Sequence, residues 1–186
     1  MTKYFNFTTI LLVLVCVGSI FIFASLARAE DPIEIDLNVK AALRKLFADS
    51  PSAKVLSKKA KGILVFPKIV KGGFVVGGQY GEGALLKDGK TNGYYNTVQL
   101  SYGFQAGLKK YGYALFFMSK SALKWLKKSD GWELGAGPTI VVIDTGKTDS
   151  GTTTTLQSDI YAFFFDQKGL MGGLSLEGTK VTKMNK

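Results

Sequence analysis

The longest apolar run of the chain lies near its N-terminus, from Ile10 to Leu26. Lys3 precedes this run, and the triplet Ala27-Arg28-Ala29 follows it. A cation, an apolar core and a small-x-small cleavage site in this order predict a secretory signal peptide at residues 1–29. Two alternatives stay open. The run is about as long as a minimal membrane span, so it could be an uncleaved anchor, and Cys16 within it could mark a lipoprotein leader.

Helical periodicity follows the signal peptide. In the segment 37–48, apolar residues recur at i, i+4, i+7 and i+8 and so share one face, namely Val39, Leu43, Leu46 and Phe47. The preceding segment Ile33–Asp36 is short and acidic and receives no assignment. Ser50-Pro51 is a typical helix start, with serine as the cap and proline at the first position. We therefore expect a second helix that runs to about Lys61.

From Gly62 onwards the apolar pattern becomes that of β-strands. Ile63–Phe66 predicts a short strand that ends at Pro67, and Asp88-Gly89 and Asn92-Gly93 predict turns. Beginning at Val98, apolar residues occupy the even positions to Leu108, which predicts a strand whose even positions are buried. Further strands are expected at Phe74–Lys87, Tyr113–Met118 (in the centre of the sheet), Glu133–Asp144, Leu156–Asp166 and Leu170–Met184.

Two segments depart from the strand pattern. Residues 119–129 predict an inserted helix, with Ala122, Trp125 and Leu126 on its apolar face and lysines on the other. The threonine-rich stretch Thr145–Thr155 predicts an exposed hairpin tip. Glycine recurs inside the strand patterns, and repeated strand glycines indicate bulges, bends and close backbone approach. The expected fold is α+β and mostly β: one domain with a strongly coiled antiparallel sheet or a closed barrel, two N-terminal helices and one inserted helix.

Composition restricts the chemistry. Without residues 1–29, the mature chain 30–186 is long enough for one domain with a proper core, and its net charge is +8 rather than +10. The sequence contains no histidine, and its one cysteine lies in the signal peptide, so the mature chain has no disulfide, thiol nucleophile or thiolate metal site. We expect no metal, no cofactor and no catalytic residue. The remaining enzyme hypothesis is a carboxylate-based glycan hydrolase that would use two of Glu82, Glu133 and Glu177.

The excess of lysine points to anionic partners. The lysines form three local groups, which a solvated surface alone could explain. They are Lys54, Lys58, Lys59 and Lys61 with Lys68 and Lys71; Lys120, Lys124, Lys127 and Lys128; and Lys180, Lys183 and Lys186. A positive field of this size attracts anionic surfaces. Outside the cytoplasm nucleic acid is not an expected partner, whereas anionic lipid headgroups are available.

Four segments together resemble the SYLF domain family. They are Lys59-Ala60-Lys61-Gly62-Ile63, Val70-Lys71-Gly72-Gly73-Phe74, Gly81-Glu82-Gly83 and the run from Lys168 to Gly178, which ends Gly-Leu-Ser-Leu-Glu-Gly. The likeness extends in order from about Leu37 to Val181. It implies a lipid-binding domain; eukaryotic relatives bind phosphoinositide membranes, and a fungal branch also binds actin.

For an exported bacterial-type member, the resemblance implies an anionic phospholipid or lipid A surface instead of phosphoinositides, and actin is not expected in that compartment. The acidic start of the mature chain, from Glu30 to Asp36, does not suit the family's N-terminal membrane segment. The candidate lipid-binding residues are therefore those that match the family's basic stretch and its continuation: Lys58, Lys59, Lys61, Lys68 and Lys71. We expect a periplasmic or secreted protein, peripheral to the cell envelope and of undetermined oligomeric state. A structural envelope protein that holds lipid inside the barrel remains an alternative.

Overall fold

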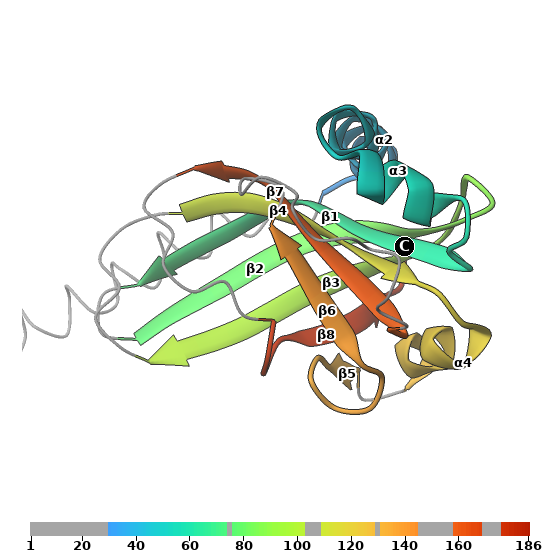
Figure 1. The fold of residues 1–186 in the computed structure, drawn as a ribbon. Coiled ribbons are helices and arrows are strands. Elements are labelled where there is room, and N and C mark those ends of the chain that lie inside the picture. Colours follow the sequence, from blue (N-terminus) through green and yellow to red (C-terminus); the bar gives the residue numbers. More distant parts are fainter. Residues whose placement is uncertain (1–29, 74–75, 103–108, 129–130, 145–157, 169–175) are drawn as a thin grey trace, which may run out of the picture. The chain divides into compact units, whose positions relative to one another are not determined.

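The computed structural model describes residues 30–73, 76–102, 109–128, 131–144, 158–168 and 176–186 (Figure 1). Residues 32–186 form one compact unit. Its elements are α2 (Pro32–Asp49), α3 (Pro51–Ser57), β1 (Gly62–Gly73), β2 (Val76–Lys87), β3 (Lys90–Tyr102), β4 (Lys109–Phe117), α4 (Lys120–Leu123), the 3-10 helix η1 (Lys124–Lys127), β5 (Trp132–Glu133), β6 (Ile140–Asp144), β7 (Ile160–Lys168) and β8 (Lys180–Met184). In the described part of the chain, no helix has the length and apolar character needed to cross a membrane.

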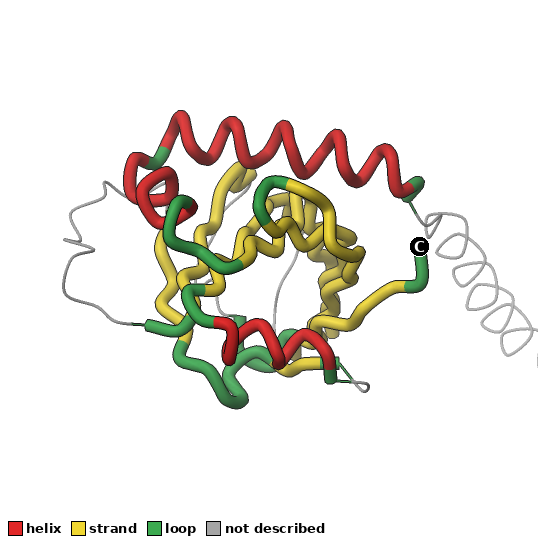
Figure 2. Tube along the Cα trace, turned by 90° about the vertical axis from the view of Figure 1, so that its right-hand side faces the viewer, coloured by secondary structure: helices red, strands yellow, loops and turns green. Residues whose placement is uncertain are grey.

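All eight strands join one sheet in the order β5-β8-β3-β2-β1-β4-β7-β6. Every pair is antiparallel except β6 and β7, which run parallel. The sheet curls strongly around its inner face, as the view along the strands shows (Figure 2). This confirms the predicted α+β, mostly β domain with a strongly coiled sheet. The closed-barrel alternative gives way to a half-barrel with β5 and β6 at its ends.

The two N-terminal helices are confirmed, with different bounds. Helix α2 begins five residues earlier than predicted, at Pro32, because Ile35 extends the buried face of Val39, Leu43 and Leu46 by one turn. Helix α3 begins as predicted, since the Ser50 hydroxyl accepts a hydrogen bond of 3.3 Å from the Ala53 amide. It ends at Ser57, four residues earlier than expected.

Strand β1 does not stop at Pro67, so that prediction was wrong. The pairing of β1 shifts with both neighbours around Pro67, between Phe66 and Ile69 on the β4 side. Such a bulge accommodates a proline, which has no amide hydrogen to donate to the sheet. Two glycines of β2 make room for it. An added Cβ at Gly81 would lie 2.7 Å from the Lys68 carbonyl oxygen, and one at Gly83 would overlap that of Val65.

Two apolar layers pack against the two faces of the sheet. The inner layer lies within the curl and contains the fully buried side chains Phe66, Tyr113, Phe117, Trp132 and Phe164. The outer layer lies under α2 and α3, where Ile35 and Val39 join strand residues such as Val65, Ala84 and Phe116. Helix α2 therefore covers part of the outer face of the sheet (Figure 2).

The alternation that starts at Val98 was assigned to the wrong face. Val98 is 38% exposed and Leu100 68% exposed, whereas Thr97 is fully buried. Thr97 is tolerated inside because its hydroxyl forms a 2.6 Å hydrogen bond with that of Tyr113. The even positions 104, 106 and 108 lie outside the described residues. Asn92-Gly93 is also not a turn, because both residues lie within β3, while Asp88-Gly89 is the predicted β2–β3 turn.

The remaining predictions are confirmed in part. Tyr113–Met118 corresponds to β4, which is an inner strand of the sheet. The inserted helix is present as a short α4 followed by η1. The expected strand Glu133–Asp144 is divided into β5 and β6. The last two expected strands correspond to β7 and β8, while their predicted first residues, 156–157 and 170–175, lie outside the described residues. The signal peptide and the tip Thr145–Thr155 lie outside the described residues.

Candidate functional site: a basic end of the sheet

Exposed lysines from two separate segments gather at one end of the sheet, which we call the basic end. It is defined by Lys58, Lys59, Lys61, Lys120, Lys124, Lys127 and Lys128, all of them exposed. The first three lie between α3 and the start of β1, and the other four lie on α4, on η1 and just after it. Figure 1 shows α3 and α4 at the same end of the strands.

Backbone pairing brings these segments together. The Lys61 amide donates a 2.7 Å hydrogen bond to the carbonyl of Phe117, three residues before α4 begins. Ser119 caps α4 by accepting a 3.1 Å hydrogen bond from the Ala122 amide. The Leu123 side chain packs beside Gly62, where an added Cβ would lie 3.1 Å from Leu123 Cδ2. The two lysine segments are thus held on adjoining strand ends.

The charge at this end is predominantly positive. Lys128 Nζ lies 3.6 Å from the centre of the Trp125 ring, a cation–π contact that holds this ammonium group at the surface. Two carboxylates lie at neighbouring strand ends. Asp88 is exposed in the β2–β3 turn, and Asp159 accepts hydrogen bonds from the amide and hydroxyl of Thr139.

Three of the five predicted lipid-binding residues belong to the basic end, and two do not. Lys68 lies at the bulge of β1, and Lys71 lies near the end of that strand. At about 3.3 Å per residue, Lys68 is roughly 20 Å and Lys71 roughly 30 Å from Lys61 along the strand. Lys68 is exposed, while Lys71 is half-buried and in contact with another residue.

The sheet also brings together lysine positions that are distant in the sequence, which sequence reasoning missed. Lys109 is the Cα partner of Lys71, and Lys110 is the Cα partner of both Val70 and Lys168. Lysine positions of three strands are therefore backbone neighbours at the end opposite the basic end. No signal in the sequence could have shown this, because it depends on the order β1-β4-β7.

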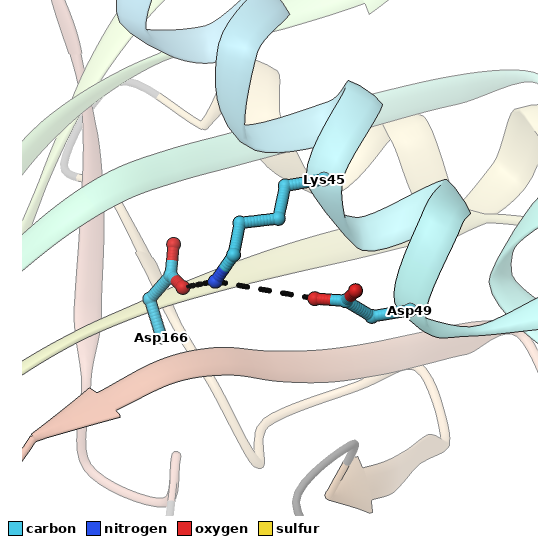
Figure 3. Close-up of polar contacts among 3 residues, drawn as sticks. All are labelled: Lys45, Asp49 and Asp166. Carbon is cyan, nitrogen blue, oxygen red and sulfur yellow. Dashed lines mark hydrogen bonds and ion pairs between the residues drawn. The ribbon is translucent and has the colours of Figure 1, made fainter.

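Helix α2 forms an ion pair with the sheet and borders a groove. Lys45 pairs with Asp166 of β7 and lies 3.9 Å from Asp49 on its own helix (Figure 3). Beside it, an open groove of about 450 Å³ combines apolar side chains with two cations; its lining residues are Leu37, Lys40, Leu43, Arg44, Phe47 and Gly89. Exposed ion pairs contribute little to stability, so Lys45 mainly orients α2.

The inner face carries a buried polar layer. The Tyr111 hydroxyl donates to Gln79 Oε1, and burial raises the pKa values of both Tyr111 and Tyr113. Gln79 Nε2 and the Thr179 hydroxyl are buried and have no hydrogen-bond partner among the described residues. Buried polar atoms of this kind are commonly satisfied by ordered water.

The three candidate glutamates do not occupy equivalent places. Glu82 is buried on β2, where it pairs with Lys186 and accepts a 2.7 Å hydrogen bond from the Tyr80 hydroxyl. Glu133 and Glu177 are exposed, in β5 and in the turn before β8. The described residues contain no group of three carboxylate, histidine or cysteine side chains that could hold a metal ion.

Comparisons of the sequence with known proteins identify relatives. The sequence model of the Ysc84 family, described as "Las17-binding protein actin regulator", matches residues 98–186. The SH3 domain-containing YSC84-like protein 1 of Rattus norvegicus is 29% identical over 126 residues, which is 65% of this chain and 37% of the relative. The human protein of the same name is 28% identical over 126 residues, covering 65% of this chain and 36% of the relative.

The matched region thus spans little more than a third of these curated relatives. The family description names an actin regulator and the names of the relatives mention an SH3 domain, and neither of them names an enzyme. The Ysc84 match covers β4 to β8 and only the last five residues of β3, and it includes the four lysines on α4, on η1 and just after it. Through this Ysc84 (SYLF) region, residues 98–186, the chain is a homologue of the YSC84-like proteins.

Proposed function

We propose that this protein binds anionic lipid surfaces through the basic end of its sheet. The observation that carries the proposal is the convergence of seven exposed lysines from two segments that are far apart in the sequence. Each cation near an anionic membrane surface contributes about 1 kcal/mol, so seven lysines give useful affinity without a deep pocket. Homology to the SYLF family, which is known for lipid binding, supports the same function.

We favour lipid binding at the surface over a lipid molecule held on the inner face of the curled sheet. In the described part of the chain, large side chains such as Trp132, Phe117 and Phe164 fill the inner face. An acyl chain there would have to displace close-packed aromatic groups, and interiors tolerate such overpacking poorly. The groove beside α2 is open and contains Lys40 and Arg44, so it suits an anionic amphiphile better than the inner face does.

We also propose that the protein is not an enzyme. The hydrolase hypothesis needs two carboxylates facing one substrate. Glu82 is buried in an ion pair on the outer face of the sheet, away from the exposed Glu133 and Glu177. The family name points to actin regulation, but we propose a lipid surface as the partner, because an exported chain does not meet actin.

The proposed compartment is the cell envelope, where phosphatidylglycerol, cardiolipin or lipid A would supply the anionic headgroups. Export rests on the apolar run 10–26 and the Ala27-Arg28-Ala29 site. N-terminal sequencing of the protein from fractionated cells is expected to begin at Glu30. Recovery of intact Met1 in the inner membrane would show that the segment is an anchor instead.

Vesicle co-sedimentation over a salt series tests the lipid contact. The variant Lys58→Glu, Lys59→Glu, Lys61→Glu is expected to bind phosphatidylglycerol vesicles roughly a hundredfold more weakly than wild type at low salt, because three of the attracting cations are lost. Wild-type binding should itself weaken with salt, since screening at about 0.15 M limits the attraction to roughly 8 Å.

A second triple variant controls for net charge. Lys40→Glu, Lys90→Glu, Lys183→Glu changes the total charge equally, but its three exposed positions are dispersed over α2, β3 and β8. It is expected to retain most of the binding. Equal losses in both variants would mean that only the total charge matters, and binding indifferent to salt and to both changes would contradict a surface electrostatic contact.

A further inference from the structure

A row of five residues crosses the outer face of the sheet beyond the area that α2 covers. Lys110, Val70, Tyr80, Val98 and Lys180 are successive Cα partners on β4, β1, β2, β3 and β8. The three middle residues are apolar or aromatic, and both end residues are lysines. With adjacent strands about 4.8 Å apart, the two lysines are separated by roughly 19 Å.

The middle of this row is exposed although it is apolar. Tyr80 is 47%, Val98 38% and Leu100 68% exposed, and Val70 is half-buried. Leu100 is the Cα partner of Gly78, and an added Cβ on that glycine would lie 3.9 Å from Leu100 Cδ2. Val70, Tyr80, Val98 and Leu100 therefore form one contiguous patch, which we call the outer strip. Contiguous exposed apolar residues with a polar rim are typical of interaction surfaces.

The rim of the outer strip is basic. Lys110 and Lys180 are exposed at its two ends, and Lys68 is exposed in β1 two residues before Val70. The nearest carboxylate on β2, Glu82, is already paired with Lys186 and with the Tyr80 hydroxyl. On the rim, Glu133 is the Cα partner of Lys180 and offsets that one cation. The remaining excess is positive, so the strip matches an anionic partner.

We infer that the outer strip is a second lipid contact, which inserts its apolar side chains into the headgroup layer of an anionic bilayer. This inference rests on the lipid-binding function proposed above. The strip lies on the outside of a curled sheet, where Leu100 and Val98 point away from the fold. Tyrosine favours the membrane interface, and the long stems of lysine let apolar neighbours enter the bilayer while the ammonium groups stay among the headgroups.

A second copy of the chain fits this surface less well than a bilayer does. In a two-fold symmetric pair the same strip would face itself, so the row with lysine at each end would meet its own lysines. Like charges placed opposite each other disfavour such a contact. An acidic helix of a partner protein would also neutralise the lysines of the rim. A lipid surface is the better partner because the basic end is proposed to bind the same kind of surface. The experiment below separates the two.

Single cysteines on the full-length chain make the contact observable. In a Cys16→Ser background, which removes the one natural cysteine, Leu100→Cys and Val98→Cys place a polarity-sensitive fluorophore on the strip. Val142→Cys is the matched control, because Val142 is exposed on the edge strand β6 and shares the inner face of the sheet with its Cα partner Ala162. The probes are vesicles of phosphatidylcholine alone and of phosphatidylcholine with an equal amount of phosphatidylglycerol. The neutral vesicles report any contribution of the apolar segment 10–26.

The anionic vesicles are expected to shift the emission of labels at positions 98 and 100 to the blue and to leave the label at position 142 unchanged. Unlabelled Leu100→Ser should bind the same vesicles about tenfold more weakly, because one inserted leucine is lost.

Wild type that sediments with the vesicles while both strip labels stay unchanged would overturn this inference alone. Wild type that does not sediment would overturn the proposed function as well. A blue shift that appears without vesicles and grows with protein concentration would show that the strip joins two copies instead. Labels that respond to an acidic amphipathic peptide but not to vesicles would show a protein partner.

Discussion

Gly83 lies where β2 passes close to the backbone of β1. Its missing side chain lets β2 pass against the bulge of β1, since an added Cβ would overlap the Val65 carbonyl oxygen and lie 2.8 Å from Phe66 Cδ1. Backbone atoms cannot move aside as a flexible side chain does. Position 83 therefore has to be glycine, which carries only a hydrogen in place of a side chain. A replacing residue with a higher strand propensity would not offset the overlap.

Gly83→Ala is therefore expected to lower the free energy of unfolding by about 3 kcal/mol, because the strand must shift to admit a methyl group. Gly78→Ala on the same strand is the control, since its Cβ would meet the nearest atom, the Gln99 carbonyl oxygen, at an ordinary 3.7 Å. Urea unfolding of both variants measures the difference. Equal stabilities would mean that the approach of β1 to β2 is looser than described.

At the scale of elements, β4 places two tyrosine hydroxyls on the buried inner face of the sheet. Tyr111 and Tyr113 are buried, and their hydroxyls form hydrogen bonds with Gln79 of β2 and Thr97 of β3 on the same inner face. Burial raises the pKa of each hydroxyl, and it also raises the pKa of Tyr95 on β3. The folded protein thus holds three tyrosine protons that an unfolded chain releases at about pH 10.

The free energy of unfolding is consequently expected to fall as the pH rises above about 10, because the unfolded state then gains stability by losing these protons. Below that pH the contribution is fully present. Urea unfolding followed at several pH values between about 8 and 11 measures the slope, and Tyr113→Phe should make it shallower by one proton. An unchanged slope in this variant would show that Tyr113 ionises in the folded state.

Buried polar groups explain why sequence patterns predicted some elements correctly and assigned others to the wrong face. Helix α2 was predictable because apolar residues alone make its buried face. Strand β3 was assigned to the wrong face because its buried side contains Thr97, which Tyr113 satisfies, while Val98 and Leu100 are exposed. Polarity predicts burial only when buried polar groups lack partners, and those partners lie on distant strands. The passage of β1 through Pro67 depended likewise on Gly81 and Gly83 of the next strand.

At the scale of the whole molecule, the sequence predicted the curled sheet but only part of the candidate site. Repeated glycines indicated the curl, and Lys58, Lys59 and Lys61 were recognisable as a basic stretch. The addition of Lys120 and Lys124 to the same surface follows from the pairing of β1 with β4. The outer strip depends on the register of β1, β2 and β3, and its basic rim also on β4 and β8. Neither could be read from spacing along the chain.

The order of the strands also sets when folding can be completed. β1 is the first strand in the sequence, yet it lies inside the sheet. The later strands are added on both sides of it: β4, β7 and β6 on one side, and β2, β3, β8 and β5 on the other. The buried Val181 of β8 belongs to the inner core, so that core is incomplete until residues near the C-terminal end have been synthesised. Contacts this distant in sequence form slowly. A growing chain with this topology cannot complete its inner core before β8 has been made, which is compatible with the export proposed above.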